Sequence, residues 1–343
     1  MTRDFTWRDA GRTVVFRRDG VAEAAELLRE HGVGEFELLS TERALVGADQ
    51  LAESASRVHE VVQGQVPVAA AALTGALAPP PQAEEGVQVR PLVALGGGRV
   101  VDVAKAIAAV SGAEVIAIPT TLSGAEMTGI HRLPAGAQER ARGMVRPSLV
   151  IADPEAMTGQ PEEQLRASAM NALAHGADTL YLPDSNPVSE MTALRGAALI
   201  AGALDEAREE RDRADLALGS ILCGYAIDSA GIGLHHLVCQ TLVRVCGTPH
   251  AETNAAILPP VLAFLAERAP EPYEHLAGAL GTDRGGLAER VAELGRPQPL
   301  GDLGGEEAKL SEAIEAMLQR PEVGSVPGPP SRPDLERLVR EAW

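Results

Sequence analysis

Hydrophobic positions follow two alternating patterns in the first half of the chain. Short apolar or β-branched runs are typical of strands, whereas longer stretches with apolar residues three and four positions apart are typical of helices. The short runs predict strands at 13–16, 36–39, 91–95 and 114–118, and at best a short edge strand at 65–68. The longer stretches predict helices at 21–31, 51–62, 69–77 and 100–111. Strands that alternate with helices at this spacing indicate a doubly wound parallel sheet.

The pattern changes after about residue 153, where β-branched runs nearly vanish. Helical periodicity then occupies 162–180, 187–211, 214–245, 255–269 and 306–318. We therefore expect an α/β N-terminal domain over residues 1–153 and an all-α C-terminal domain over residues 154–343. The cleft between two such domains is the default position for a ligand. The Pro- and Glu-rich stretch 79–88 is predicted to be a surface loop.

Length and charge narrow the class of protein. A chain of 343 residues is long enough for two domains, and a hydrophobic content of 45% is enough for a core. The net charge of −18 disfavours phosphate backbones and anionic lipids, so we expect neither nucleic acid nor membrane as a partner. A small anionic ligand is still compatible, because backbone amides and helix ends can bind an anion locally.

The cysteines and the N-terminal stretch bear on the compartment. Cys223, Cys239 and Cys246 include no CxxC pair, which is typical of reduced thiols. The N-terminal stretch lacks the apolar segment of a signal peptide, and no apolar run reaches the roughly 18 residues of a membrane span. These features predict a cytoplasmic protein.

The stretch LVALGGGRVVDVAKA, residues 92–106, is the sharpest local motif. Gly96, Gly97 and Gly98 lie between a predicted strand and a predicted helix, where backbone amides and the helix N-terminus can approach a phosphate. An ordinary tight turn is the alternative, because the GxGxxG fingerprint is absent. Arg99 is placed either to clamp a diphosphate or to lie in solvent. Asp102, in the helix that follows, joins the candidate cofactor-binding residues.

The stretch IPTTLSGAEMT, residues 118–128, follows the next predicted strand. Its hydroxyls and amides lie at a carboxyl strand end, where ligands of open α/β sheets bind. An ordinary loop with a helix cap is the alternative.

Histidines supply the candidate chemistry of the second half. Asn171 and His175 are four residues apart and share a helix face, as do His236 and Gln240. His250 follows in the sequence GTPHAE. Such a set can converge on a metal ion or on a substrate oxygen. A histidine of this kind taken alone is more often a structural residue.

Four motifs together resemble the iron-containing alcohol dehydrogenase superfamily, and the maleylacetate reductase branch in particular. They are GGGRVVDVAKA, PTTLSGAEMT, MNALAHGADTLYLPDSNP and GLHHLVCQTL with GTPHAETNA. The resemblance implies a nicotinamide-binding α/β domain and a helical domain. It implies that Gly96, Gly97 and Gly98 cradle the cofactor diphosphate. It also implies that Thr120, Thr121 and Leu122 line the cofactor near the ribose and nicotinamide.

The same resemblance assigns the metal ligands of the family to Asn171, His175, His236 and His250. Asn171 stands where metal-dependent relatives have their only carboxylate, so zinc or iron is a doubtful cofactor here, with the three histidines as the candidate ligands. These four residues are also the candidate catalytic groups, with His236 foremost.

Other positions depart from the family pattern. Gln240 stands where a further histidine is usual, and Arg99 replaces the usual serine of the glycine turn. Thr41 replaces an Asp that NAD-selective relatives use to bind the adenosine ribose, which leaves room for the 2′-phosphate of NADPH. The sequence leaves NADH and NADPH open as the cofactor.

Two functions are compatible with these features. The first is an NAD(P)H-dependent reductase of a small carbonyl or enone, with altered site residues. The alternative is a scaffold that has lost redox chemistry and works as a lyase- or cyclase-like catalyst or as a binding protein. The apolar strand at 13–16 is near a chain end, so we expect it to form a sheet edge that pairs in a homodimer.

Overall fold

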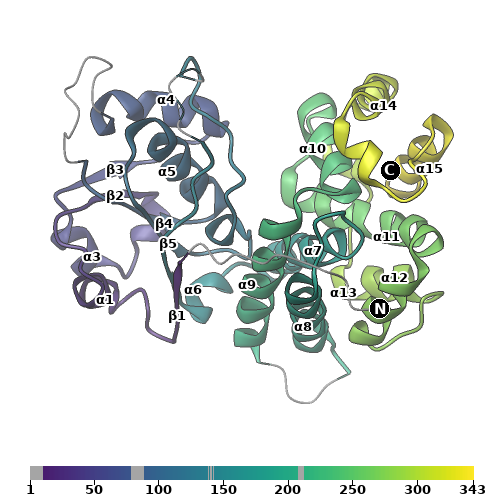
Figure 1. The fold of residues 1–343 in the computed structure, drawn as a ribbon, viewed down its shortest axis with the longest axis horizontal. Coiled ribbons are helices and arrows are strands. Elements are labelled where there is room, and N and C mark those ends of the chain that lie inside the picture. The colour runs from purple at the N-terminus through teal and green to yellow at the C-terminus, as the bar shows by residue number, and fades with distance from the viewer. Residues whose placement is uncertain (1–10, 79–88, 138, 140, 142, 208–211) are drawn as a thin grey trace. The chain divides into compact units, whose positions relative to one another are not determined.

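The computed structural model describes the chain except residues 1–10, 79–88, 138, 140, 142 and 208–211. The predicted surface loop at 79–88 therefore lies outside the described residues. The chain divides into two compact units, one of which ends at Gly159 while the other begins at Gln160 (Figure 1). The short helix α6, Pro154–Met157, stays with the first unit, and the carboxylate of Asp153 caps it by accepting from the Glu155 amide at 3.0 Å.

The first unit is built on a six-stranded sheet in which every neighbouring pair is parallel (Figure 1). The strand order is β1-β6-β5-β4-β2-β3. The strands are β1 Thr13–Phe16, β2 Glu37–Ser40, β3 Arg57–Glu60, β4 Leu92–Gly96, β5 Val115–Pro119 and β6 Leu149–Ala152. This topology confirms the doubly wound parallel sheet, and it places β1 at an edge.

Helices bury both faces of this sheet. They are α1 Ala24–Glu30, α2 Glu42–Leu45, α3 Asp49–Ser54, α4 Val66–Leu77 and α5 Gly98–Ser111, with the short 3₁₀ turn η1 Ala125–Met127. One core cluster joins Leu39 of β2 to residues of α4 and α5, and a second joins Leu38 to residues of α1 and α3. Successive residues of a strand point to opposite faces, so a buried parallel strand is apolar throughout.

Three details of the predicted strands and helices were wrong. The helix expected at 51–62 ends as α3 at Ser54, and β3 begins at Arg57. The segment 65–68 is the start of α4 and not an edge strand, because Pro67 suits the first turn of a helix. The strand β6 was not predicted at all. β3 is a sheet edge with only His59 buried, so its sequence RVHE carries no strong apolar signal.

The second unit is helical, as expected from its periodicity. Its helices are α7 Glu162–Thr179, α8 Pro187–Leu204, α9 Arg213–Ala230, α10 Leu234–Cys246, α11 His250–Arg268, α12 Pro270–Leu280, α13 Leu287–Gly295, α14 Leu310–Leu318 and α15 Arg332–Ala342, with the 3₁₀ turns η3 Leu300–Leu303, η4 Glu307–Lys309 and η5 Pro321–Ser325. The predicted continuous helical stretch at 214–245 is wrong, because the chain turns by 96° between α9 and α10. Gly231 ends α9 with φ +89°, a backbone conformation that favours glycine.

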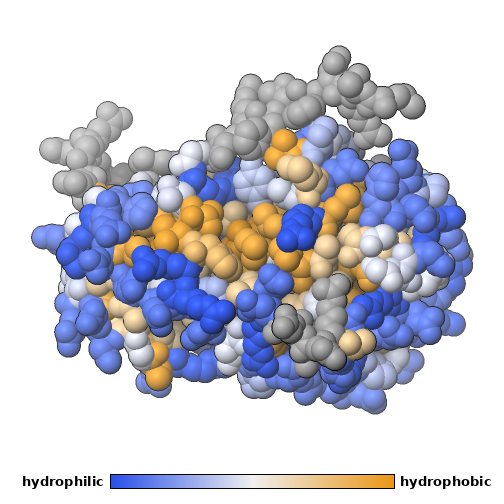
Figure 2. Space-filling view, turned by 90° about the horizontal axis from the view of Figure 1, so that it is seen from below, coloured by the Kyte–Doolittle hydropathy of each residue, from blue (hydrophilic) through white to orange (hydrophobic). Residues whose placement is uncertain are grey.

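No single helix in the described part of the chain is long and apolar enough to cross a membrane, and only the bent pair α9 and α10 meets the criteria of length and composition jointly. Most residues of these two helices are buried within the protein. The three cysteines are free and buried. Figure 2 shows hydrophilic residues over much of the visible surface, with hydrophobic residues gathered in patches between them.

Candidate functional site

A pocket of about 540 Å³ opens in the α/β unit where three neighbouring strands end. Thr41 follows β2, Gly97 follows β4, and Thr120 follows β5. The complete lining is Thr41, Glu42, Arg43, Ala44, Glu60, Val61, Gln63, Gly97, Gly98, Arg99, Val100 and Thr120. The carboxyl edge of an open parallel sheet is where such folds bind nucleotides, so this pocket is the candidate cofactor site.

The glycine turn has no room for side chains. A Cβ on Gly96 would lie 2.7 Å from Val100 Cγ2, and one on Gly98 would lie 2.8 Å from the Ser123 side chain. A Cβ on Gly97 would meet Thr121 Cγ2 at 3.0 Å. Gly97 is the N-cap of α5, so the free amides of a 14-residue helix begin at the wall of the pocket. These amides and the positive helix end suit a diphosphate.

Of the other predicted cofactor residues, some line the pocket and some do not. Arg99 lines the pocket, whereas Leu122 is fully buried in the protein core. Asp102 does not line the pocket, and its carboxylate lies 2.8 Å from the ammonium of Lys105. Sequence reasoning missed Arg43 and Glu60, because the segments that carry them show no motif.

Lys105 holds the segment after β5 against α5. Its ammonium is completely buried and donates to the carbonyl oxygens of Ala125, Thr128 and Ile130 at 2.8, 3.0 and 2.9 Å. The residues 120–128 therefore share one anchor with the helix that begins at the glycine turn. A buried cation with this many acceptors gives the pocket a rigid wall.

A larger hollow of about 850 Å³ lies at the amino ends of the same strands. Its lining includes Glu35, Glu37 and Glu114, and Arg90 is paired with the first two at 2.9 and 3.1 Å. This excess of carboxylates disfavours a phosphate ligand. Size alone therefore does not identify the cofactor site.

The helical unit brings most of its predicted residues together. Asn171 and His175 lie on α7, and His236 lies in the first turn of α10. The rings of His175 and His236 are stacked, with centroids 4.7 Å apart and planes 13° apart. His250 is the first residue of α11 and is exposed, and its electrostatic interaction with both rings lowers their pKa values.

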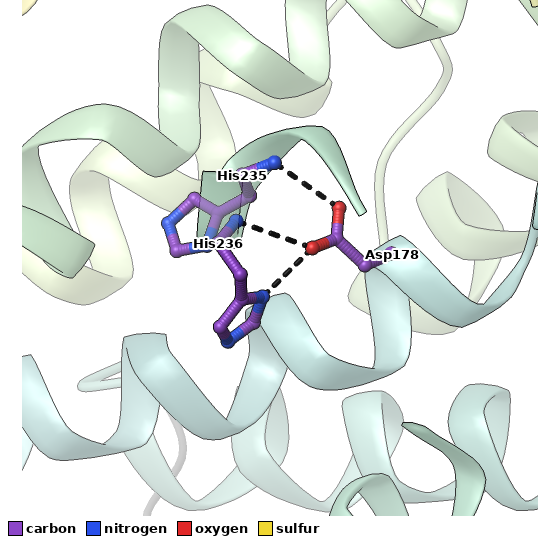
Figure 3. Close-up of side chains that lie close together, drawn as sticks. All are labelled: Asp178, His235 and His236. Carbon is purple, nitrogen blue, oxygen red and sulfur yellow. Dashed lines mark hydrogen bonds and ion pairs between the residues drawn. The ribbon is translucent and has the colours of Figure 1, made fainter. Parts of the chain in front are cut away.

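Asp178 is the residue that sequence reasoning missed. It lies three residues after His175 on the same face of α7, and this spacing was a signal that could have found it. Its carboxylate accepts from His236 Nδ1 at 2.7 Å and from the backbone amides of His235 and His236 at 3.3 Å (Figure 3). Gly233 allows this approach, because a Cβ there would lie 2.5 Å from the Asp178 carboxylate.

Burial sets the charge of this group of residues. It lowers the pKa of His236 to about 3 and of His235 to about 4, and it lowers the pKa of His175 well below its usual value. It raises the pKa of Asp178, although hydrogen bonds from His236, His235 and Gly233 oppose the rise. At neutral pH the three imidazoles are therefore uncharged, and each offers one N–H donor and one lone pair.

The two histidines of α10 use their nitrogens differently. His235 is fully buried, and its Nε2 donates to the Asn254 carbonyl at 2.9 Å. His236 donates from Nδ1 to Asp178, and its Nε2 is buried with no hydrogen-bond partner among the described residues. Each histidine of this pair thus keeps one nitrogen without a partner among the described residues, Nδ1 in His235 and Nε2 in His236, and only the ring of His236 is stacked on that of His175.

The rings of His175 and His236 do not aim their nitrogens at one common metal position as they lie. A metal ion binds an imidazole nitrogen in the plane of the ring, at about 2.0–2.1 Å for zinc. The nearly parallel planes of His175 and His236 do not meet at such a point. Asp178, His235 and His236 have possible ligand atoms within 4.8 Å of one another, but the carboxylate already accepts hydrogen bonds from both histidines.

Gln240 has a partner from a distant part of the helical unit. Its amide oxygen accepts from Arg320 Nη1 at 3.1 Å, and Arg320 also pairs with Glu322. The hydrogen bonds that Arg320 donates to Glu322 lower the pKa of the Glu322 carboxyl. The residue that replaces the usual histidine therefore ties α10 to the segment around η5.

Both units match models of one family. A model described as iron-containing alcohol dehydrogenase matches residues 12–154, and the C-terminal model of the Fe-containing alcohol dehydrogenase family matches residues 166–343. Maleylacetate reductase 1 of Rhodococcus opacus is 34% identical over 74% of this chain and 72% of its own length. Maleylacetate reductase of Pseudomonas aeruginosa is 31% identical over 96% of this chain and 95% of its own.

Solved structures agree with this. The crystal structure of maleylacetate reductase from Rhizobium sp. strain MTP-10005 superposes with a TM-score of 0.85 at 30% identity, covering 100% of this chain and 99% of that one. The parallel-sheet unit and the helical unit match the two-domain fold of this structure. The chain belongs to the iron-containing alcohol dehydrogenase family. It is an oxidoreductase, and its relatives support a reductase that uses NAD(P)H.

Replacing Gly97 with Val tests the cofactor pocket. The new side chain would press on Thr121 and occupy the space beside the amides of α5. Losing two or three charge-assisted hydrogen bonds at about 1.5–3 kcal/mol each would weaken NADPH binding by more than about 10²-fold. Cofactor fluorescence titration measures this change. Gly75→Val in α4 is the control, because a Cβ there meets nothing within 4 Å. Equal affinity in the two folded variants would remove the glycine turn from the cofactor site.

Proposed function

We propose that the protein is an NAD(P)H-dependent reductase of a small carbonyl or enone substrate, with maleylacetate as the first compound to test. The observation that carries the proposal is the glycine turn at the start of α5, which lines a pocket at the carboxyl edge of the sheet. The names of the relatives supply the substrate class. The pocket would hold the cofactor, and the histidines of the helical unit would act on the substrate oxygen.

The reaction transfers a hydride from the reduced nicotinamide to carbon, and a proton balances the charge on the substrate. His236 Nε2 is the proposed relay for this proton. Its lone pair takes up a proton from solvent and passes it to the substrate, and the ring returns to its neutral form. Asn171 and His175, on the neighbouring helix, are the proposed hydrogen-bonding groups for the oxygen. His250, at the start of α11, completes the candidate set.

The test is a titration with NADPH and NADH followed by an assay of carbonyl-dependent cofactor oxidation. We expect NADPH to bind at least as tightly as NADH, because Thr41 is neutral and Arg43 lines the same pocket. Oxidation of the cofactor should then depend on maleylacetate or a similar compound. If neither cofactor binds, the alternative of a non-redox catalyst or binding protein replaces the reductase.

His236→Ala should separate catalysis from packing. Removing a group that carries a proton to the substrate typically lowers turnover by about 10²–10⁴-fold. Cofactor affinity should persist, because the glycine turn belongs to the other unit. His235→Ala should lower turnover by less than about tenfold and lower thermal stability instead, since His235 is fully buried and bonded to Asn254. Equal turnover in the two variants, measured on folded protein, would end the assignment of His236.

We propose that the protein does not need a metal ion. Asn171 in place of a carboxylate and the stacked rings of His175 and His236 support this. Purified protein should contain well under one equivalent of iron, and treatment with a chelator should leave activity unchanged. Elemental analysis with an assay before and after chelation measures both. Stoichiometric iron whose removal abolishes activity would contradict the proposal.

We also propose a homodimer that forms through β1. This strand is a sheet edge, and Val14 is 37% exposed on it. An exposed strand edge is a template for pairing with a second copy. Light scattering at micromolar concentration should give the mass of a dimer. Val14→Lys should shift the mass toward the monomer, because a charge on the edge opposes pairing. A monomeric mass for the unaltered chain would refute the dimer.

A further inference from the structure

Asp178 is a buried carboxylate that the proposed function has not yet used. Its exposed fraction is 0%, and three hydrogen bonds to it come from α10. A hydrogen bond from the Gly233 backbone also lowers the pKa of the Asp178 carboxyl. Charged side chains are rarely buried completely unless they are paired, so its position needs an explanation beyond packing.

One part of the explanation is helix capping. The first three amides of α10 belong to Leu234, His235 and His236 and have no partners within the helix. Tyr181 Oη accepts from Leu234 at 2.5 Å, and the Asp178 carboxylate accepts from His235 and His236. Two residues from or beside the end of α7 therefore cap α10 in place of a local N-cap side chain.

Capping does not account for the shortest contact. The bond from His236 Nδ1 to the carboxylate measures 2.7 Å, against 3.3 Å for each backbone amide. A carboxylate only accepts hydrogen bonds, so this contact requires the proton of the neutral ring to be on Nδ1. It leaves the lone pair on Nε2, the buried nitrogen without a partner among the described residues.

We propose that Asp178 is the positioning residue of His236: it locks the ring in the Nδ1–H tautomer and so leaves the lone pair of Nε2 to relay the proton that the substrate receives. The role of Nε2 rests on the proposed function, whereas the tautomer of His236 does not depend on the reaction. Asp178 touches neither substrate nor cofactor in this role. Its contribution is to hold one ring in one orientation and one protonation pattern.

The pair of Asp178 and Tyr181 offers a matched comparison. Asp178→Asn keeps the size of the side chain but exchanges a pure acceptor for a neutral amide. The amide accepts more weakly from Nδ1–H and can itself donate, so the Nε2–H tautomer becomes populated. Tyr181→Phe removes the cap of Leu234 and the hydrogen bond between Tyr181 and Asp178, and it leaves the carboxylate that accepts from His236 in place. Both variants weaken the start of α10, but only Asp178→Asn changes the group that accepts from the ring.

The experiment measures tautomer, turnover and stability in both variants. The ring nitrogen shifts of ¹⁵N-labelled histidine report the tautomer, and His236→Gln assigns the signals. We expect His236 to be Nδ1–H in the unaltered protein and in Tyr181→Phe, and to gain Nε2–H in Asp178→Asn. Turnover should fall by about 10²-fold in Asp178→Asn with KM for the cofactor unchanged, and should stay within about threefold in Tyr181→Phe.

Each departure from this result overturns the proposal. Equal losses of turnover and melting temperature in the two variants would make Asp178 a cap alone. A changed tautomer with normal turnover, or lost turnover with an unchanged tautomer, would separate the ring from the reaction. If the unaltered protein has no reductase activity, the proposed function fails, and the nitrogen shifts still decide whether Asp178 sets the tautomer.

Discussion

The start of α10 depends on a carboxylate that it does not itself supply. The chain turns sharply after α9, so α10 begins in the protein interior with unpaired amides. Asp178 of α7 satisfies two of them, and its Oδ2 also accepts from the ring of His236. One interaction therefore stabilises a buried helix end and orients the candidate reacting group. It also requires a glycine at 233, because the helices approach too closely for a side chain.

In the α/β unit, a buried cation pairs backbone carbonyl oxygens, as the buried carboxylate of Asp178 pairs backbone amides in the helical unit. The buried ammonium of Lys105 satisfies carbonyl oxygens of the segment that follows β5 and holds them against α5. The glycine turn lies at the N-terminus of α5. There, Gly97 and Gly98 pack against Thr121 and Ser123. Backbone and side chains are thus held close together at the carboxyl edge of the sheet. A rigid edge of this kind presents amides to a ligand without reorganisation.

Much of the fold could be predicted because its pattern is local. Buried strands such as β4 and β5 are apolar throughout, and α5 and α7 carry long helical periodicity. β3 was missed because an edge strand buries one face and needs few apolar residues. The break between α9 and α10 was missed because both helices are apolar and only the glycines around 231–233 mark the turn.

The sequence by itself determined the parallel α/β unit, the helical unit, the glycine turn and the resemblance to a family of oxidoreductases. Those features depend on residue type and spacing over short stretches, which a single chain displays directly. Only the tertiary structure decided which nitrogen of His236 is paired, and that Asp178 is its partner. A hydrogen bond between α7 and α10 links residues 58 positions apart, and no local pattern specifies such a contact. The hydrogen bonds of His235 and His236 decide which nitrogen of each ring has no partner among the described residues. That choice is therefore a property of the folded protein.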